Sequence, residues 1–255
     1  MTLNSFRAVL FPVFGLLALA QLPAIAWAVC DDPPDRRVNW MRCDKQKVDL
    51  QGVDLRQSVL TQVNLTDANL TGARLSGADL GGATLDRADF SGVTLVGSRL
   101  VSAQANQAVF AGANLAGARL DRAVLIGANF NEANLSGARL DGANLTEAQL
   151  SGANLSQVNL SQANLLDAQL PKANLSGADL TRAVLEEAVL TGADLSGARL
   201  DGANLLGVDF TGADLSRANL TNARIDGAQF TDTRLDSTIW VDRRRCRPGS
   251  VGECR

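Results

Sequence analysis

The chain has 255 residues, lacks both His and Tyr, and carries 24 Lys and Arg against 27 Asp and Glu. The missing imidazole and phenol groups exclude His-dependent acid–base catalysis, His-ligated metals and tyrosine acids, and the mild acidity gives no electrostatic footprint for nucleic acid. Residues 1–28 hold Arg7 as their one charged side chain, so the remaining chain has a net charge of 23 − 27 = −4.

Residues 1–28 have the three parts of a secretory signal peptide. Arg7 and the N-terminal amine form a short basic region, and an apolar stretch follows over Ala8–Ala20. Ala26 and Ala28 then place small residues at the two positions that signal peptidase reads. Because the apolar run is shorter than the roughly 20 residues that span a bilayer, we expect cleavage after Ala28 rather than an uncleaved anchor. This predicts a periplasmic or secreted protein, or a thylakoid-lumen protein if the source is a cyanobacterium.

Four cysteines flank the central part of the chain, at Cys30, Cys43, Cys246 and Cys254. Exported proteins meet an oxidising compartment, where an even number of cysteines favours disulfides. A four-cysteine zinc site is the alternative, but the intervals of 12 and 7 residues differ from the short C-x₂₋₄-C pairs typical of such sites. The sequence therefore predicts disulfides.

A five-residue repeat fills the region between the cysteine pairs. From Leu50 to Leu235 every fifth residue is Leu, Phe or Ile, except Ala105, and a small residue usually stands two positions earlier. The other positions are mostly polar, as in the segment 113–117, Ala-Asn-Leu-Ala-Gly. A period of five fits neither a helix nor a flat strand, so it predicts an all-β solenoid in which the small and large residues point inward.

The phenylalanines indicate how many repeats make one coil. The five Phe beyond residue 28 are all separated by multiples of twenty: Phe90, Phe110, Phe130, Phe210 and Phe230. Coils of four pentapeptides would stack these rings in a single interior column.

Tandem A(D/N)LxG pentapeptides resemble the pentapeptide repeat family. The resemblance covers residues 48–240 and implies a right-handed quadrilateral β-helix of about 9–10 coils. The segments Cys30-Asp31-Asp32-Pro33-Pro34 and Ile239-Trp240-Val241-Asp242 resemble the two ends of exported family members. The expected organisation is a signal peptide at 1–28, an N-terminal cap at 29–47, the β-helix at 48–240 and a C-terminal cap at 241–255.

The length of this rod limits the disulfide pairing. Thirty-eight repeats at four per coil give 9.5 coils, or about 45 Å at the usual spacing between strands. Disulfide Cα atoms lie roughly 4.4–6.8 Å apart, so cysteines at opposite ends cannot pair within one molecule. We therefore expect the disulfides Cys30–Cys43 and Cys246–Cys254. We also expect Trp40 and Trp240 to cover the leucine column at the two ends of the rod.

Outward side chains form columns at twenty-residue spacing. An arginine column could bind an anionic ligand, but a neighbouring aspartate column is expected to neutralise the positive charge of the arginines. A third column of asparagines is expected to form a hydrogen-bonded ladder. The arginine column is Arg99, Arg119, Arg139 and Arg199, the aspartate column is Asp121, Asp141 and Asp201, and the asparagine column is Asn114, Asn134, Asn154 and Asn174.

Three further features interrupt the pattern. Arg243-Arg244-Arg245 with Arg247 is a basic cluster that suits an anionic lipid or an acidic partner, or simply a solvated end cap. Ala105 predicts a leucine-sized gap, a pinched coil or a bulge. Glu186-Glu187 is the one adjacent glutamate pair, on a surface without a base or cleft.

These patterns predict an exported, non-enzymatic protein-interaction solenoid without cofactor or metal, and with no stable membrane span once the leader is removed. The alternative is a DNA-mimic inhibitor or protector of a topoisomerase, which the leader and the mixed charges disfavour. No nucleic-acid partner is expected, and the oligomeric state stays open. Exposed apolar residues gather in one outward region, which we call the predicted interaction face, for self-association or partner binding; the alternative is that branched residues stand there because they favour strands. The residues are Val124, Ile126, Leu166, Val184 and Leu206.

Overall fold

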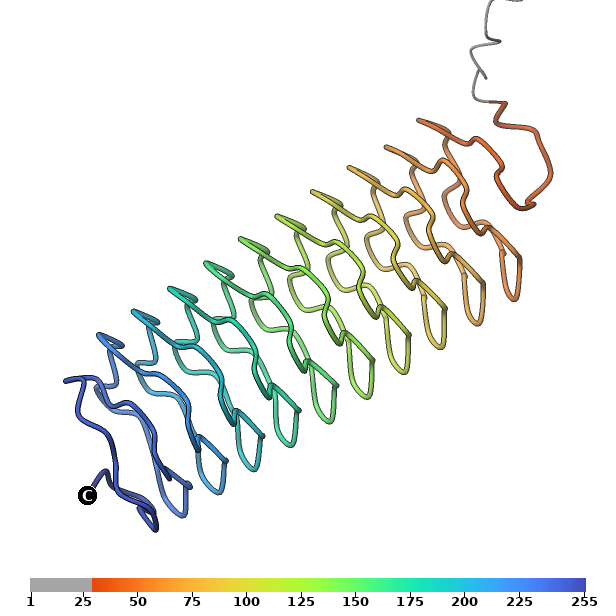
Figure 1. Cartoon of the computed structure of the whole chain (residues 1–255). Helices are drawn as coiled ribbons and strands as arrows, with labels where there is room; N and C mark the ends of the chain where they lie inside the picture. The colour runs from red at the N-terminus through yellow and green to blue at the C-terminus, as the bar shows by residue number, and fades with distance from the viewer. Residues whose placement is uncertain (1–28) are drawn as a thin grey trace, which may run out of the picture.

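The computed structural model describes residues 29–255, so the predicted signal peptide lies outside the described residues. The chain winds into a straight rod of stacked coils, with the first described residues at one end and the C-terminus at the other (Figure 1). Among residues 29–255 no helix has the length and apolarity needed to cross a membrane.

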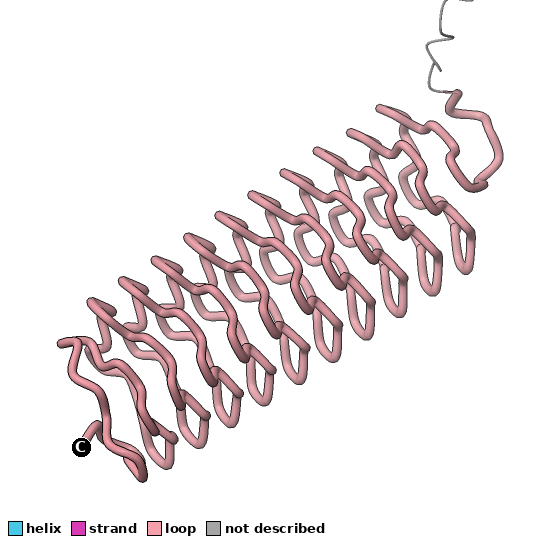
Figure 2. The backbone as a smooth tube through the Cα atoms, in the orientation of Figure 1, coloured by secondary structure: helices cyan, strands magenta, loops and turns pink. Residues whose placement is uncertain are grey.

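Parallel pairing between residues i and i+20 builds the rod. The ladder runs without interruption from Asn39↔Val59 to Asn219↔Ile239, so every coil takes twenty residues, as the phenylalanine spacing predicts. The ladder spans 200 residues, which is ten coils and about 48 Å at the usual strand spacing. Each pentapeptide contributes one bridge residue and one turn, so the described chain has neither helices nor long strands (Figure 2).

Hydrogen bonding within one pentapeptide explains the consensus sequence. The N–H of Ala73 donates to the carbonyl of Leu70 at 2.9 Å, and Gly72 between them has a φ of 66°, which is the pattern of a type II turn. The N–H groups of Leu70 and Gly72 donate to the next coil at 2.7 and 2.9 Å, and that of Asn69 donates to the preceding coil at 3.0 Å. The Asn69 side chain accepts the remaining N–H, that of Thr71, at 3.1 Å. Asparagine or aspartate before the leucine thus completes the backbone hydrogen bonding.

The interior consists of stacked columns of leucine and alanine. The structure places the five phenylalanines in one such column, continued by leucines between residues 130 and 210. Ring centroids are 4.9 Å apart for Phe90–Phe110, 4.7 Å for Phe110–Phe130 and 5.3 Å for Phe210–Phe230. These stacks sit at the spacing of the coils, so the aromatic column follows directly from the twenty-residue period.

The backbone passes Ala105 without a bulge. Gln104 pairs with Thr84 before it and with Val124 after it, and the Ala105 N–H donates to the next coil at 2.8 Å. Ala105 is fully buried. Of the three expected outcomes, the bulge is wrong, because the turn hydrogen bonds hold the backbone period whatever the size of the side chain.

The ladder begins at Asn39, inside the segment 29–47 that the sequence assigned to a cap. Trp40 takes the interior position that leucine holds elsewhere, is 1% exposed, and donates its indole N–H to the Asp32 carbonyl at 3.1 Å. Lys45 occupies the next leucine position, with its ammonium 4.4 Å from the centre of the Trp40 ring. The Cys30–Cys43 disulfide joins the lead-in to this first coil.

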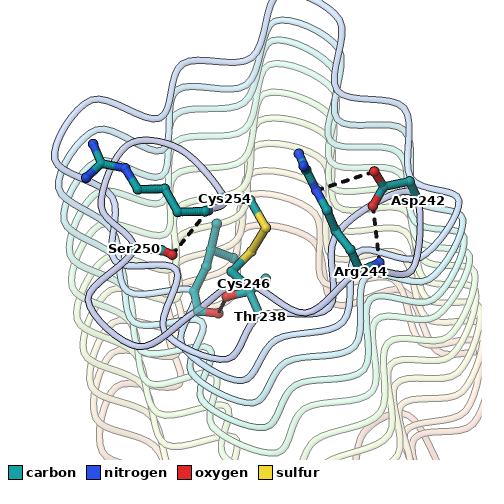
Figure 3. Close-up of a disulfide and its surroundings, with 8 residues drawn as sticks. Thr238, Asp242, Arg244, Cys246, Ser250 and Cys254 are labelled. Carbon is teal, nitrogen blue, oxygen red and sulfur yellow. Dashed lines mark hydrogen bonds and ion pairs between the residues drawn. A yellow bond between two sulfur atoms is a disulfide. The ribbon is translucent and has the colours of Figure 1, made fainter.

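The C-terminal tail, residues 241–255, folds back over the last coil (Figure 3). It pairs antiparallel with the coil through Ile239↔Arg245 and Arg234↔Val251, and the Cys246–Cys254 disulfide closes it. Trp240 packs on Phe230 with ring centroids 5.3 Å apart. Both disulfides have the pairing that the rod length allows.

Candidate interaction surfaces

Outward-facing side chains are the candidate functional groups. In the described part of the chain no pocket opens, and no three His, Cys, Asp or Glu side chains gather into a possible metal site. Glu186 is half-buried and Glu187 is exposed on the side of the rod, without a cleft around them. What this molecule presents to other molecules is therefore the sides and ends of the rod.

Arginine and aspartate neutralise each other on one side of the rod. Asp121 is 6% exposed and lies between two arginines, 3.4 Å from Arg119 and 3.1 Å from Arg139. Arg199 lies 3.2 Å from Asp179, and Arg99 likewise contacts an aspartate of the adjacent coil. The arginine column is thus paired along its length and does not form a free anion-binding stripe.

Two further aspartates near the N-terminal end are held ionised by arginine. The Arg56 side chain donates to Asp54 at 2.8 Å and holds the pKa of that carboxyl well below its usual range. The Arg87 side chain donates to Asp67 at 2.7 Å and also lowers its pKa. Since both arginines are more than a third exposed, these pairs contribute modestly to stability.

The asparagine column forms part of the expected ladder. Asn134 donates to Asn114 at 3.4 Å, and Asn154 donates to Asn134 at 3.3 Å. The same side-chain oxygens accept backbone N–H groups in their own turns, as Asn134 does from Ser136 at 3.1 Å. These amides are occupied by internal hydrogen bonds, which assigns them a structural role.

The predicted interaction face lies on one side of the rod. Ile126, Leu166 and Leu206 stand in one column, each about 10 Å from the next because two coils separate them. Val124 and Val184 stand two residues away, in the neighbouring column of bridge residues. Ile126 is 37% exposed, and the other four are half-buried. The register brings all five together over five coils.

Four carboxylates share this side of the rod with the apolar residues. The pentapeptides 123–127, 143–147, 163–167, 183–187 and 203–207, which we call the apolar-acidic face, contain no lysine or arginine. Its acids form no ion pair within the described chain, and Glu186 instead accepts from the Asn204 amide at 2.9 Å. The four are Glu147, Asp167, Glu186 and Glu187.

The sequence analysis selected the apolar members of this face but did not connect them with its acids, of which it named Glu186 and Glu187 alone. The signal was available, because Glu147, Asp167 and Glu187 share one twenty-residue register that borders the apolar columns. Their lack of arginine partners, by contrast, depends on which columns become neighbours, and this is visible in the structure alone.

The family described as Pentapeptide repeats matches this chain in eight copies. The matched residues are 46–82, 64–101, 73–110, 106–146, 143–182, 168–205 and 207–236. No curated protein matches the chain.

Two solved structures are similar to this chain over most of their length. HetL, a pentapeptide repeat protein involved in heterocyst differentiation regulation from the cyanobacterium Nostoc sp. strain PCC 7120, is 34% identical, with 79% of this chain and 92% of HetL covered and a TM-score of 0.42. QnrB1, a plasmid-mediated fluoroquinolone resistance protein, is 20% identical, with 72% and 92% covered and a TM-score of 0.57. At that identity the likeness to QnrB1 concerns the fold alone.

Proposed function

We propose that this chain, which belongs to the pentapeptide repeat family, is an exported, non-enzymatic solenoid that binds a partner protein through its apolar-acidic face. Its coils are those of a right-handed quadrilateral β-helix, whose flat sides present side chains at fixed spacing. The signal-peptide pattern of residues 1–28 and the two disulfides support an exported location.

The proposal rests on the carboxylates of the apolar-acidic face, which form no ion pair within the described residues. On another side of the rod, aspartates lie beside arginines, as around Asp121. On the apolar-acidic face, four carboxylates without ion pairs flank Ile126, Leu166 and Leu206. Apolar side chains bordered by unneutralised charge suit a partner with a basic, apolar surface, because both burial and charge complementarity then favour association.

The experiment that tests this proposal uses a triple variant of the mature protein, which carries Ile126→Ser, Leu166→Ser and Leu206→Ser. The parent and the variant are immobilised and exposed to the envelope fraction of the source cell, and the bound proteins are identified after cross-linking. We expect one basic protein on the parent and at least about a tenfold loss of it on the variant, since each lost apolar anchor costs about 1–2 kcal/mol of binding.

A matched control removes three outward valines from other sides of the rod, Val96→Ser, Val109→Ser and Val189→Ser. This control should retain the partner, and all three proteins should give the same circular dichroism spectrum. Equal binding of the partner by the parent and by the triple Ile126/Leu166/Leu206 variant would contradict the proposal. Export is tested separately by fractionation and N-terminal sequencing, which should find a mature chain beginning at Val29.

A further inference from the structure

Charge is distributed unevenly along the rod. The N-terminal end, residues 29–58, has six Lys and Arg against six acids, and the body, residues 59–222, has 10 against 16, a net charge of 10 − 16 = −6. The last coil and the tail, residues 223–255, have seven arginines against five acids, a net charge of 7 − 5 = +2. The molecule is therefore an acidic rod with one basic end.

Three of the five tail arginines form no ion pair within residues 29–255. Arg244 lies 3.4 Å from Asp242 (Figure 3), and Arg255 lies 2.7 Å from Glu253, so these two are neutralised. The other three are exposed: Arg243, Arg245 and Arg247. Their guanidinium groups are free to bind an external anion, and a phosphate group accepts two hydrogen bonds from each of them.

The backbone of the tail holds these arginines in a fixed arrangement. Arg243 begins the tail in a turn with a φ of 70°, and Arg245 pairs with Ile239 of the last coil. Cys246 is 1% exposed and is fixed by its disulfide. Because successive residues of an extended segment face opposite ways, Arg245 and Arg247 on either side of it point outward. This order lowers the conformational entropy that the backbone loses on binding.

The tail offers charge but little apolar surface. Protein–protein interfaces depend on apolar or aromatic anchors near their centre. Val251 is the one large apolar side chain that residues 241–255, all of them described, expose. No pocket opens at the tail or elsewhere in the described chain. A charged surface without anchors or a pocket suits a lipid bilayer, because its phosphate groups move laterally to meet the arginines.

We propose that the tail binds an anionic phospholipid surface, so that the rod stands on a membrane by its C-terminal end. The three unpaired arginines bind the lipid phosphate groups. The same surface repels the body of the rod, whose net charge is −6, and this favours an upright rod over one that lies flat. An upright rod leaves the apolar-acidic face free along its side.

The N-terminal end lacks this arrangement. Its lead-in exposes three carboxylates, those of Asp31, Asp32 and Asp35. The Arg37 side chain there donates to Gln57 of the next coil at 3.0 Å. Balanced charges and exposed carboxylates oppose binding of this end to an anionic surface.

Vesicle flotation of the mature protein tests the proposal. We expect the protein to bind vesicles of phosphatidylglycerol and phosphatidylcholine at low ionic strength, and to leave them as the salt concentration rises. It should not bind vesicles of phosphatidylcholine alone. A triple variant with Arg243→Gln, Arg245→Gln and Arg247→Gln should bind the anionic vesicles roughly a hundredfold more weakly, because each basic residue near such a surface strengthens binding about fivefold.

Neutron reflectometry on a supported bilayer of the same anionic composition tests the orientation. The bound parent should form a protein layer about 48 Å thick, which is the length of the ladder. A layer only as thick as the rod is wide would show that the rod lies flat, and would overturn the proposal.

A matched control removes the same charge from three exposed arginines that form no ion pair in the described chain, through Arg36→Gln, Arg122→Gln and Arg182→Gln. This control should bind anionic vesicles as the parent does, and all three proteins should give the same circular dichroism spectrum. No binding by the parent, or an equal loss in the control and the triple variant, would contradict the proposal.

Two further outcomes would replace the membrane by another anion. Release of the bound protein by inorganic phosphate, at an ionic strength at which chloride leaves it bound, would assign the arginines to a free anion. Retention on immobilised polyglutamate without vesicle binding would assign them to an acidic protein. None of these readouts involves the apolar-acidic face, so they test the tail separately from the proposed function.

Discussion

The two ends of this rod are built from the same parts and differ in what those parts cover. Each end has a tryptophan on the leucine register and a short disulfide loop. Trp40 is 1% exposed beneath the lead-in, whereas Trp240 is only half-buried and packs on Phe230, itself half-buried.

The difference shows that closing a β-solenoid involves two separate tasks. One is to cover the last layer of apolar side chains, and the other is to occupy or shield the backbone edge. The N-terminal end buries Trp40, Leu50 and Leu55 and leaves Val48 and Val53 half-buried, while the C-terminal end pairs with the tail through Arg234 and Ile239 and leaves Ile225 and Phe230 half-buried. The tryptophan of the N-terminal end is therefore the more fully packed of the two.

The largest expected effect comes from removing Trp40, with Trp240 as the comparison. Trp40→Ala should lower the free energy of unfolding by about 4 kcal/mol, because it empties a fully buried site. Trp240→Ala should cost less than half as much, since its ring is already partly in water. Chemical denaturation followed by circular dichroism measures both, and equal losses would show that the two ends are equally well packed.

Removing the disulfides should have the next largest effect. Cys30→Ser/Cys43→Ser opens a loop with a sequence separation of 13, and Cys246→Ser/Cys254→Ser one of 8. Loop entropy then predicts losses of about 3 and about 2.5 kcal/mol. Chemical denaturation of both double variants beside the parent measures these losses, and equal stability of parent and variants would contradict the prediction.

Turn glycines at the two ends should respond by smaller amounts. Gly52 in the first coils and Gly227 in the last coil have φ values of 67° and 72°, a region that disfavours side chains. Gly52→Ala should cost about 1 kcal/mol. Gly227→Ala should cost less, because its side of the coil is paired on one edge alone and relaxes more readily. Thermal unfolding of both variants beside the parent provides the comparison.

Acid should have the smallest effect, and it should act near the N-terminal end. Arg56 and Arg87 lower the pKa values of Asp54 and Asp67 in the folded state. Their stabilisation is therefore fully present above the ordinary aspartate pKa of about 4 and is lost as pH falls through the lowered folded values. The unfolding temperature should drop slightly below pH 4, and less so in Asp54→Asn. A loss centred at neutral pH would point to other groups.

The sequence by itself determined the period, the coil and the identity of the interior. A leucine at every fifth position, a small residue two before it and phenylalanines at multiples of twenty leave one way to fold, because each repeat must bury the same two side chains and repeat the same turn. The pairing of the cysteines follows as well, since the rod keeps its two ends far apart.

The tertiary structure alone decided how the irregular residues are used. Trp40 extends the coil into the predicted cap because an indole fills the place of a leucine, and Ala105 leaves the backbone unchanged because turn hydrogen bonds set its path. The same holds for the acids of the apolar-acidic face and for the half-open C-terminal coil. Whether a carboxylate meets an arginine, or an edge meets a tail, depends on how neighbouring coils and the tail are placed in space, which no local pattern in the chain encodes.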